Sequence, residues 1–98
     1  MGSSLKSAQF LFESRIRDAL LGDPSAYYDL GVFYSTGSGG VTLDLIEAHK
    51  WFNLAAVGGV EAAQACRAEI SEDMTAREIA TAQGAARAWI AQTMRRAA

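Results

Sequence analysis

The 98-residue sequence contains few residues that build covalent, metal or catalytic sites: one cysteine, one histidine and one proline. Cys66 cannot form a disulfide within the chain, which favours a reducing compartment, and we expect it to be inert and partly buried. His49 has no second histidine or cysteine to complete a zinc site. We expect it to be a surface or half-buried helical residue, and we expect no metal, no cofactor and no enzymatic activity.

The sequence also has no large excess of either positive or negative charge, since its formal net charge is only -2. A nucleic-acid-binding module normally has a strong basic excess, so we expect no nucleic-acid partner. The apolar runs are too short for a membrane span, and no signal-peptide-like stretch precedes Glu13 and Arg15. We therefore expect one small cytoplasmic domain without membrane insertion, with a periplasmic location as the alternative if the chain is a fragment.

The alternating pattern of half-buried strands is missing, and apolar residues recur at helical spacing instead. The pattern predicts an all-α fold of about five helices joined by short loops, so that neighbouring helices are antiparallel. The predicted helices cover residues 7–21, 24–35, 44–58, 60–70 and 75–94. Their ends are marked by Gly22 with Pro24, Gly37, Asp44, the pair Gly58-Gly59 and the capping box Thr75–Glu78.

Two segments of the chain show a faint internal repeat. "GDPSAYYDLG" begins at Gly22 and "GVEAAQACRA" begins at Gly59, so the offset is 59 − 22 = 37 residues. This period falls in the range of helical repeats. In this register Ala26 aligns with Ala63, and a small residue at that point lets two helix axes approach closely.

The segment 26–59, "AYYDLGVFYSTGSGGVTLDLIEAHKWFNLAAVGG", resembles a Sel1-like repeat, a relative of the tetratricopeptide repeat. The matching positions are Ala26, Tyr28, Leu30, Gly31, Tyr34, Gly37, Gly39, Val41, Asp44, Ala48, Lys50, Trp51, Phe52, Ala55, Ala56 and Gly59. Residues 62–89 are similar to the closing segment of bacterial members, including Arg67 and Trp89. The resemblance implies a short α/α solenoid in which the matched residues, Trp89 included, are structural.

On this resemblance we divide the single domain into three parts. An N-terminal capping helix covers residues 5–21, a complete repeat covers 24–59, and a partial repeat with a C-terminal capping helix covers 60–97. The first helix departs from the family pattern, because Ser14 and Arg15 stand where an aromatic pair would fall. We therefore interpret it as a degenerate half-repeat.

The glycine-rich segment "TGSGGVTLD", residues 36–44, resembles a phosphate-binding loop at first sight. A P-loop needs a lysine directly after its last glycine, but Val41 and Thr42 follow Gly40. A dinucleotide-binding loop needs a third glycine where Thr42 stands, and it follows a strand rather than a helix. We therefore expect the glycines to turn the chain after a helix end.

The resemblance implies that the chain binds a protein partner, as an adaptor, scaffold or regulator in bacterial signalling or envelope processes. A solenoid leaves an extended face open for such a partner. The candidate contacts are of two kinds. Three are large apolar side chains outside the buried stripes of their helices, Phe10, Tyr27 and Ile46. Two are loop hydroxyls without a structural role, Ser38 and Thr42.

Three alternatives accompany this interpretation. Phe10 could instead pack inside an irregular N-terminal cap. The main partner could be a second copy of the chain, since a short solenoid has two terminal faces. Some disulfide-rich relatives have been linked to β-lactam binding, but this chain lacks their cysteine pairs and any Ser-x-x-Lys motif, which argues against an enzyme.

Overall fold

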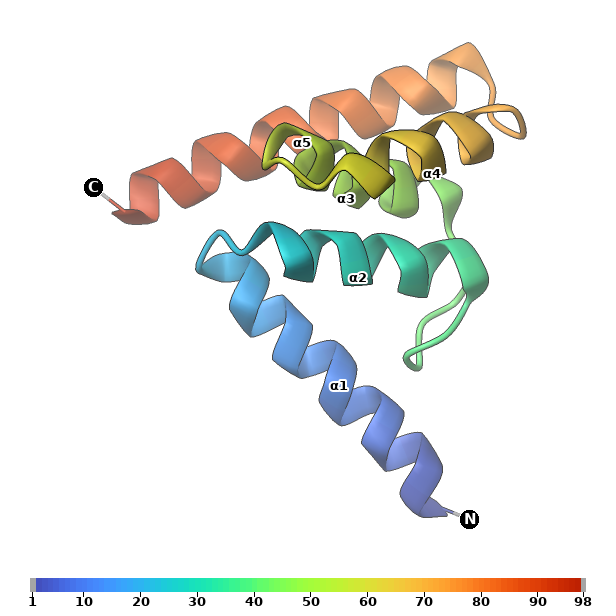
Figure 1. Ribbon diagram of the computed structural model, residues 1–98, viewed down its shortest axis with the longest axis vertical. Helices are drawn as coiled ribbons and strands as arrows, with labels where there is room; N and C mark the ends of the chain where they lie inside the picture. Colours follow the sequence, from blue (N-terminus) through green and yellow to red (C-terminus); the bar gives the residue numbers. More distant parts are fainter. Residues whose placement is uncertain (1, 98) are drawn as a thin grey trace.

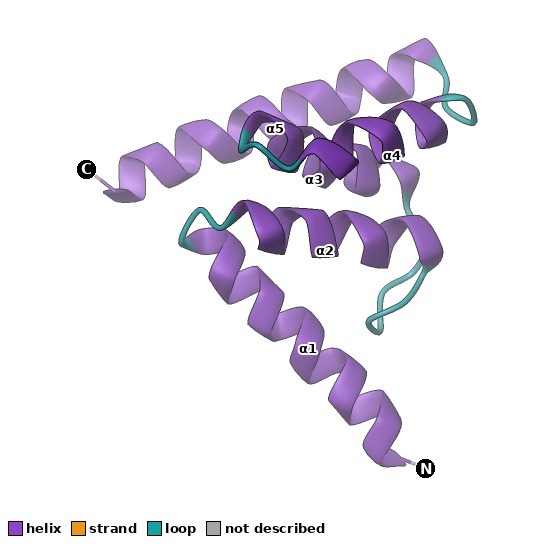
Figure 2. Ribbon diagram, in the orientation of Figure 1, coloured by secondary structure: helices purple, strands orange, loops and turns teal. Residues whose placement is uncertain are grey.

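The computed structural model describes residues 2–97, and the side chains of residues 7–94. These residues form five α-helices and no strand (Figure 2), which confirms the predicted all-α fold. The helices are α1 (Gly2–Leu20), α2 (Pro24–Thr36), α3 (Leu45–Val57), α4 (Glu61–Ser71) and α5 (Ala76–Ala97). Only the outermost ends differ clearly from the prediction, because α1 begins at Gly2 and α5 ends at Ala97.

The helices are arranged in layers around α2 and α3. Figure 1 shows α2 between α1 on one side and the group of α3, α4 and α5 on the other. Helix α3 packs against α2, α4 and α5, whereas α1 packs against α2. The N-terminal part of α1 points away from the other helices (Figure 1), so one long side of α1 is left without a neighbour.

The helix ends form where the sequence places capping residues. The Asp44 carboxylate accepts hydrogen bonds from the backbone N–H groups of Ile46 and Glu47, at 3.0 and 3.1 Å, and so starts α3. At the start of α5, the Glu78 side chain accepts from the Thr75 N–H at 2.8 Å, and the Thr75 hydroxyl accepts from the Glu78 N–H at 3.1 Å. This reciprocal pair is the predicted capping box.

Small residues let the helices of the core approach closely. A Cβ atom added at Gly31 would lie 2.5 Å from the Phe52 ring, so only glycine fits where α2 meets α3. Phe52 is itself among the largest fully buried side chains. Ala26 and Ala63, the two residues aligned by the internal repeat, are both fully buried, as expected for close helix packing.

His49 is more deeply buried than predicted. Its side chain is 3% exposed, and its Nδ1 atom has no hydrogen-bond partner among the described residues. The expectation of a surface or half-buried histidine is therefore wrong. The reason is that α4 also covers α3: Arg67 of α4 donates a hydrogen bond to Asn53 Oδ1 on α3, beside His49 in the next turn.

Candidate interaction surface

Tyr27 does not belong to any exposed surface, so its assignment as a partner contact is wrong. It is 9% exposed, and its ring stacks on Trp51 with 5.8 Å between the ring centroids. Its hydroxyl accepts a hydrogen bond from the Trp89 Nε1–H at 3.2 Å. Tyr27 lies outside the apolar stripe that the sequence predicts for α2. It is buried because α5, which is distant in the sequence, covers the side of α2 on which Tyr27 lies.

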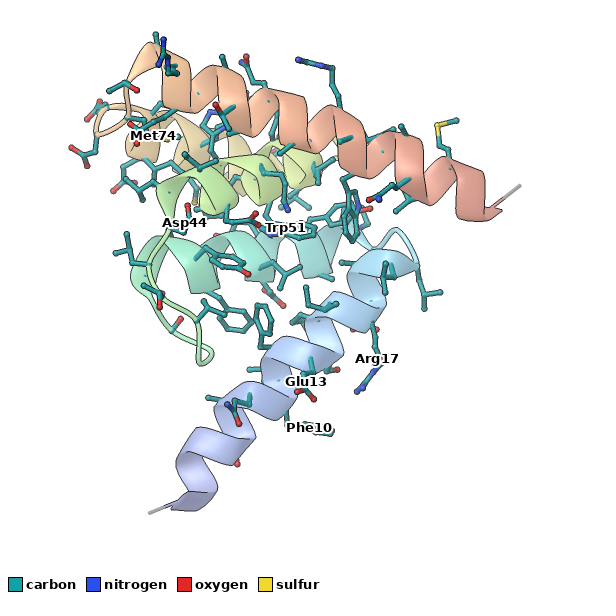
Figure 3. The ribbon with its side chains drawn as sticks, turned by 180° about the vertical axis from the view of Figure 1, so that it is seen from behind. Phe10, Glu13, Arg17, Asp44, Trp51 and Met74 are labelled. Carbon is teal, nitrogen blue, oxygen red and sulfur yellow. The ribbon has the colours of Figure 1, made fainter. Side chains whose placement is uncertain are left out.

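The aromatic cluster of Tyr27, Trp51 and Trp89 has its polar atoms paired within the chain. Trp51 and Trp89 meet edge to face at 4.8 Å, and Trp51 Nε1–H donates to Glu47 Oε2 at 3.1 Å. The Lys50 ammonium lies 4.2 Å from the Trp51 ring centroid and 2.9 Å from Glu47 Oε2. The cluster therefore stabilises the fold, and both of its indole N–H groups are used within the chain. Figure 3 labels Trp51, which lies in the interior of the molecule.

Several backbone donors of the glycine-rich loop are used within the chain. The N–H groups of Ser38, Val41 and Asp44 donate to carbonyl oxygens of Phe33, Ser38 and Tyr34 at 3.0, 3.3 and 2.9 Å. A phosphate cradle needs such N–H groups to point at the anion. The loop therefore has the geometry of a turn rather than that of a nucleotide site.

The glycines of this loop have structural reasons. Gly37 closes α2 with a φ of 71°, in the left-handed region that favours glycine. Gly39, with a φ of 69°, lies flat on Phe33, since an added Cβ atom would be 2.9 Å from that ring. Both residues turn the chain, as predicted, and Val41 is half-buried at the end of the turn.

The remaining loop-side candidates lie near the junction of α2 and α3. Ser38 and Thr42 are exposed, and the Ser38 hydroxyl is 2.7 Å from the hydroxyl of Thr36. Ile46 is half-buried in the first turn of α3. The structure therefore does not bring the five candidates into one surface, because Phe10 lies on α1 and Tyr27 lies in the core.

Phe10 is 67% exposed, and it lies on the side of α1 that faces away from α2 (Figure 3). The opposite side of α1 makes the packing contacts: the ring of Phe12 lies 6.1 Å from that of Phe33 and 5.9 Å from that of Tyr34. The described residues thus do not cover Phe10 as a cap would. Of the two alternatives for this residue, packing within the N-terminal cap finds no support among the side chains of residues 7–94.

A shallow apolar hollow of about 220 Å³ lies between the turn that joins α1 to α2 and the C-terminal half of α5. Figure 1 shows this turn near that part of α5. Its lining residues are Leu20, Leu21, Gly22, Thr93 and Met94. Leu21 is 85% exposed and Met94 is 68% exposed. Sequence reasoning missed this hollow because its two walls lie at opposite ends of the chain. The only sequence feature that pointed to the hollow was the apolar pair Leu20-Leu21 directly before Gly22.

Other kinds of site find little support in the described residues. Within the described part of the chain, no three acidic, histidine or cysteine side chains come together as a metal site would need. Cys66 is half-buried, as expected, with its Sγ atom 3.8 Å from the Tyr28 hydroxyl. Among residues 2–97, no helix has both the length and the apolar content needed to cross a membrane.

Comparison with known proteins returns no matching family model, no matching curated protein and no matching solved structure.

Proposed function

We propose that the chain is a non-enzymatic protein-binding module, an adaptor or scaffold built as a short bacterial Sel1-like array. The observation that carries this proposal is the group of large apolar side chains presented to solvent by the outer side of α1 and by the adjoining hollow. Phe10, Leu21 and Met94 are each more than half exposed. Large apolar side chains exposed in this way are typical of an interaction surface.

The repeat part of the proposal is supported by the packing of α2 against α3. These helices form an antiparallel pair around Gly31 and Phe52, both of which are positions matched by the family pattern. Ala26 lies in the first turn of α2, and Ala63, the residue of α4 aligned with it in the internal repeat, is fully buried as well. A repeat that stacks through small residues at fixed positions fits this arrangement.

Site-specific photo-crosslinking in cell extract tests the proposal. A photoreactive phenylalanine analogue at position 10 should label one specific protein. An excess of chain without the analogue should compete for this protein or, where the labelled protein is a second copy of the chain, should itself become the labelled product. The same analogue at Thr81, an exposed residue of α5, is the matched control. Equal, non-competed labelling from both positions would contradict a dedicated surface on α1.

A further inference from the structure

We propose that the partner of α1 is a second copy of the chain, bound antiparallel along α1 about a two-fold axis. This inference rests on the proposed function, because it names the partner of the same surface. The residues concerned are Phe10, Glu13, Arg17 and Leu20, which we call the outer stripe of α1. They are spaced alternately three and four residues apart, so they share one side of the helix.

The outer stripe is exposed along its length. All four residues are exposed, and Figure 3 shows Phe10, Glu13 and Arg17 on the side of α1 that faces away from α2. The packing side of α1 is formed by other residues, such as Phe12 and the fully buried Ala19. A second helix can therefore lie along the stripe without displacing α2.

The charges of the stripe fit a second copy of itself. In an antiparallel pair whose axis passes midway between Glu13 and Arg17, each Glu13 faces Arg17 of the other copy. Phe10 lies as far before this midpoint as Leu20 lies after it, so the same pairing places Phe10 against Leu20 of the other copy. A two-fold interface requires this self-complementarity, in which two different residues of one surface face each other reciprocally. A parallel pair would place like charges together.

Both charged residues of the stripe are available for such pairing. Among the side chains of residues 7–94, neither Glu13 nor Arg17 forms an ion pair, although one helical turn separates them. Arg15, by contrast, lies 3.5 Å from Asp18 and 3.6 Å from Asp29. The inner side of α1 thus uses its charge within the chain, whereas the outer stripe does not.

The hollow extends the same surface beyond Leu20. In the antiparallel pair, Phe10 of the second copy arrives at Leu20, which is also a wall of the hollow beside Leu21 and Met94. The volume of about 220 Å³ is sufficient for an aromatic ring, since a cavity of about 150 Å³ holds benzene. Phe10 of each copy can therefore insert beside α5 of the other.

The expected complex is a weak dimer. Specific interfaces usually bury about 1,200–2,000 Å² in total. An interface made of one short helix pair and of the Phe10 ring of each copy lies at the small end of that range. We therefore expect a dissociation constant on the order of micromolar. Sedimentation velocity over a concentration series should show a monomer–dimer equilibrium for the full chain.

Charge-reversal variants test the pairing directly. E13R makes the stripe entirely basic and R17E makes it entirely acidic, so each variant alone should lose dimerisation by at least about tenfold. An equimolar mixture of the two variants should associate again, because the basic stripe then faces the acidic one. Both side chains are exposed, and thermal melting followed by circular dichroism checks that each variant is folded.

Two further variants test the apolar contacts and the direction. F10S should weaken the dimer, whereas L43S, which changes an exposed leucine away from the stripe, should not. In a C66A background, oxidation of mixed F10C and L20C chains should yield a mixed disulfide dimer. F10C alone should yield little, because in an antiparallel pair the two positions 10 lie at opposite ends of the interface.

A chain that stays monomeric at all concentrations, or charge variants that associate like the unmodified chain, would overturn the second copy as partner. Efficient disulfide formation by F10C alone would overturn the antiparallel arrangement. If the chain is monomeric but crosslinking from position 10 still labels one specific protein, the proposed protein-binding function stands and only its partner changes.

Discussion

The indole Nε1–H of Trp89 donates a hydrogen bond to the hydroxyl of Tyr27 at 3.2 Å, although the two residues lie 62 positions apart in the sequence. The two rings also meet edge to face, with centroids 6.4 Å apart. Together they join α5 to the start of α2, and Trp51 of α3 contacts both rings. The last helix of the chain is thereby linked to the middle of the fold.

We expect Y27F to lower the free energy of unfolding by about 1–2 kcal/mol. The substitution keeps the ring but removes the acceptor of the Trp89 N–H, and an unpaired donor in a buried place is unfavourable. Urea denaturation of Y27F, W89F and the double variant forms a double-mutant cycle. If the two losses simply add, the hydrogen bond makes no net contribution and the prediction is wrong.

Two glycine-to-alanine substitutions should change stability in opposite directions. G31A places a Cβ atom 2.5 Å from the buried Phe52 ring, so we expect a loss of about 1–3 kcal/mol from overpacking. G84A lies within α5, where the nearest atom to an added Cβ is the end of Arg87 at 3.7 Å. There alanine should gain up to about 1 kcal/mol from helix propensity. Thermal and urea unfolding measure both, and equal effects of the two changes would contradict the close approach at Gly31.

Helix ends could be predicted from the sequence because they depend on near neighbours. Asp44 needs only the N–H groups of the next three residues to start α3, and Thr75 needs only Glu78 to start α5. The burial of Tyr27 could not be predicted in the same way. It depends on Trp89, which no local period links to it.

The same distinction between near and distant neighbours applies to the proposed interaction surface. The exposure of Phe10 could be anticipated from its place outside the apolar stripe of one helix, because that stripe is a local pattern. The hollow could not, since Leu21 and Met94 come together only when α1 and α5 have packed on either side of the core. The proposed dimer pairing uses Glu13 and Arg17, whose significance appears only once the inner side of α1 is known.

Removal of the α3 cap should destabilise the protein modestly. D44A deprives the N–H groups of Ile46 and Glu47 of their acceptor, and the loss of such a cap usually costs about 1 kcal/mol. D44N keeps an acceptor oxygen and should recover most of the loss. D73A, in the exposed turn before α5, is the matched control and should have an effect below about 0.5 kcal/mol. A D44A variant as stable as D73A, measured by urea unfolding, would show that the cap contributes nothing.

His49 should make the stability depend on pH between about pH 7 and 5. Burial lowers the pKa of His49, and the positive charge of Arg67 lowers it further. The unfolded chain takes up a proton at the ordinary histidine pKa of about 6.5, while the folded chain does so only at lower pH. The unfolded state therefore binds more protons in this window, and the stability due to neutral His49 is complete above it and is lost as the pH falls.

The expected slope is at most about 1.4 kcal/mol per pH unit. Urea unfolding of the unmodified chain and of H49Q at pH 7, 6 and 5 measures it, and the difference between the two proteins removes the common contribution of the carboxylates. H49Q should lose less stability than the unmodified chain on going from pH 7 to pH 5, because glutamine does not titrate. Parallel curves for the two proteins would mean that His49 titrates alike in the folded and unfolded states, contrary to its burial.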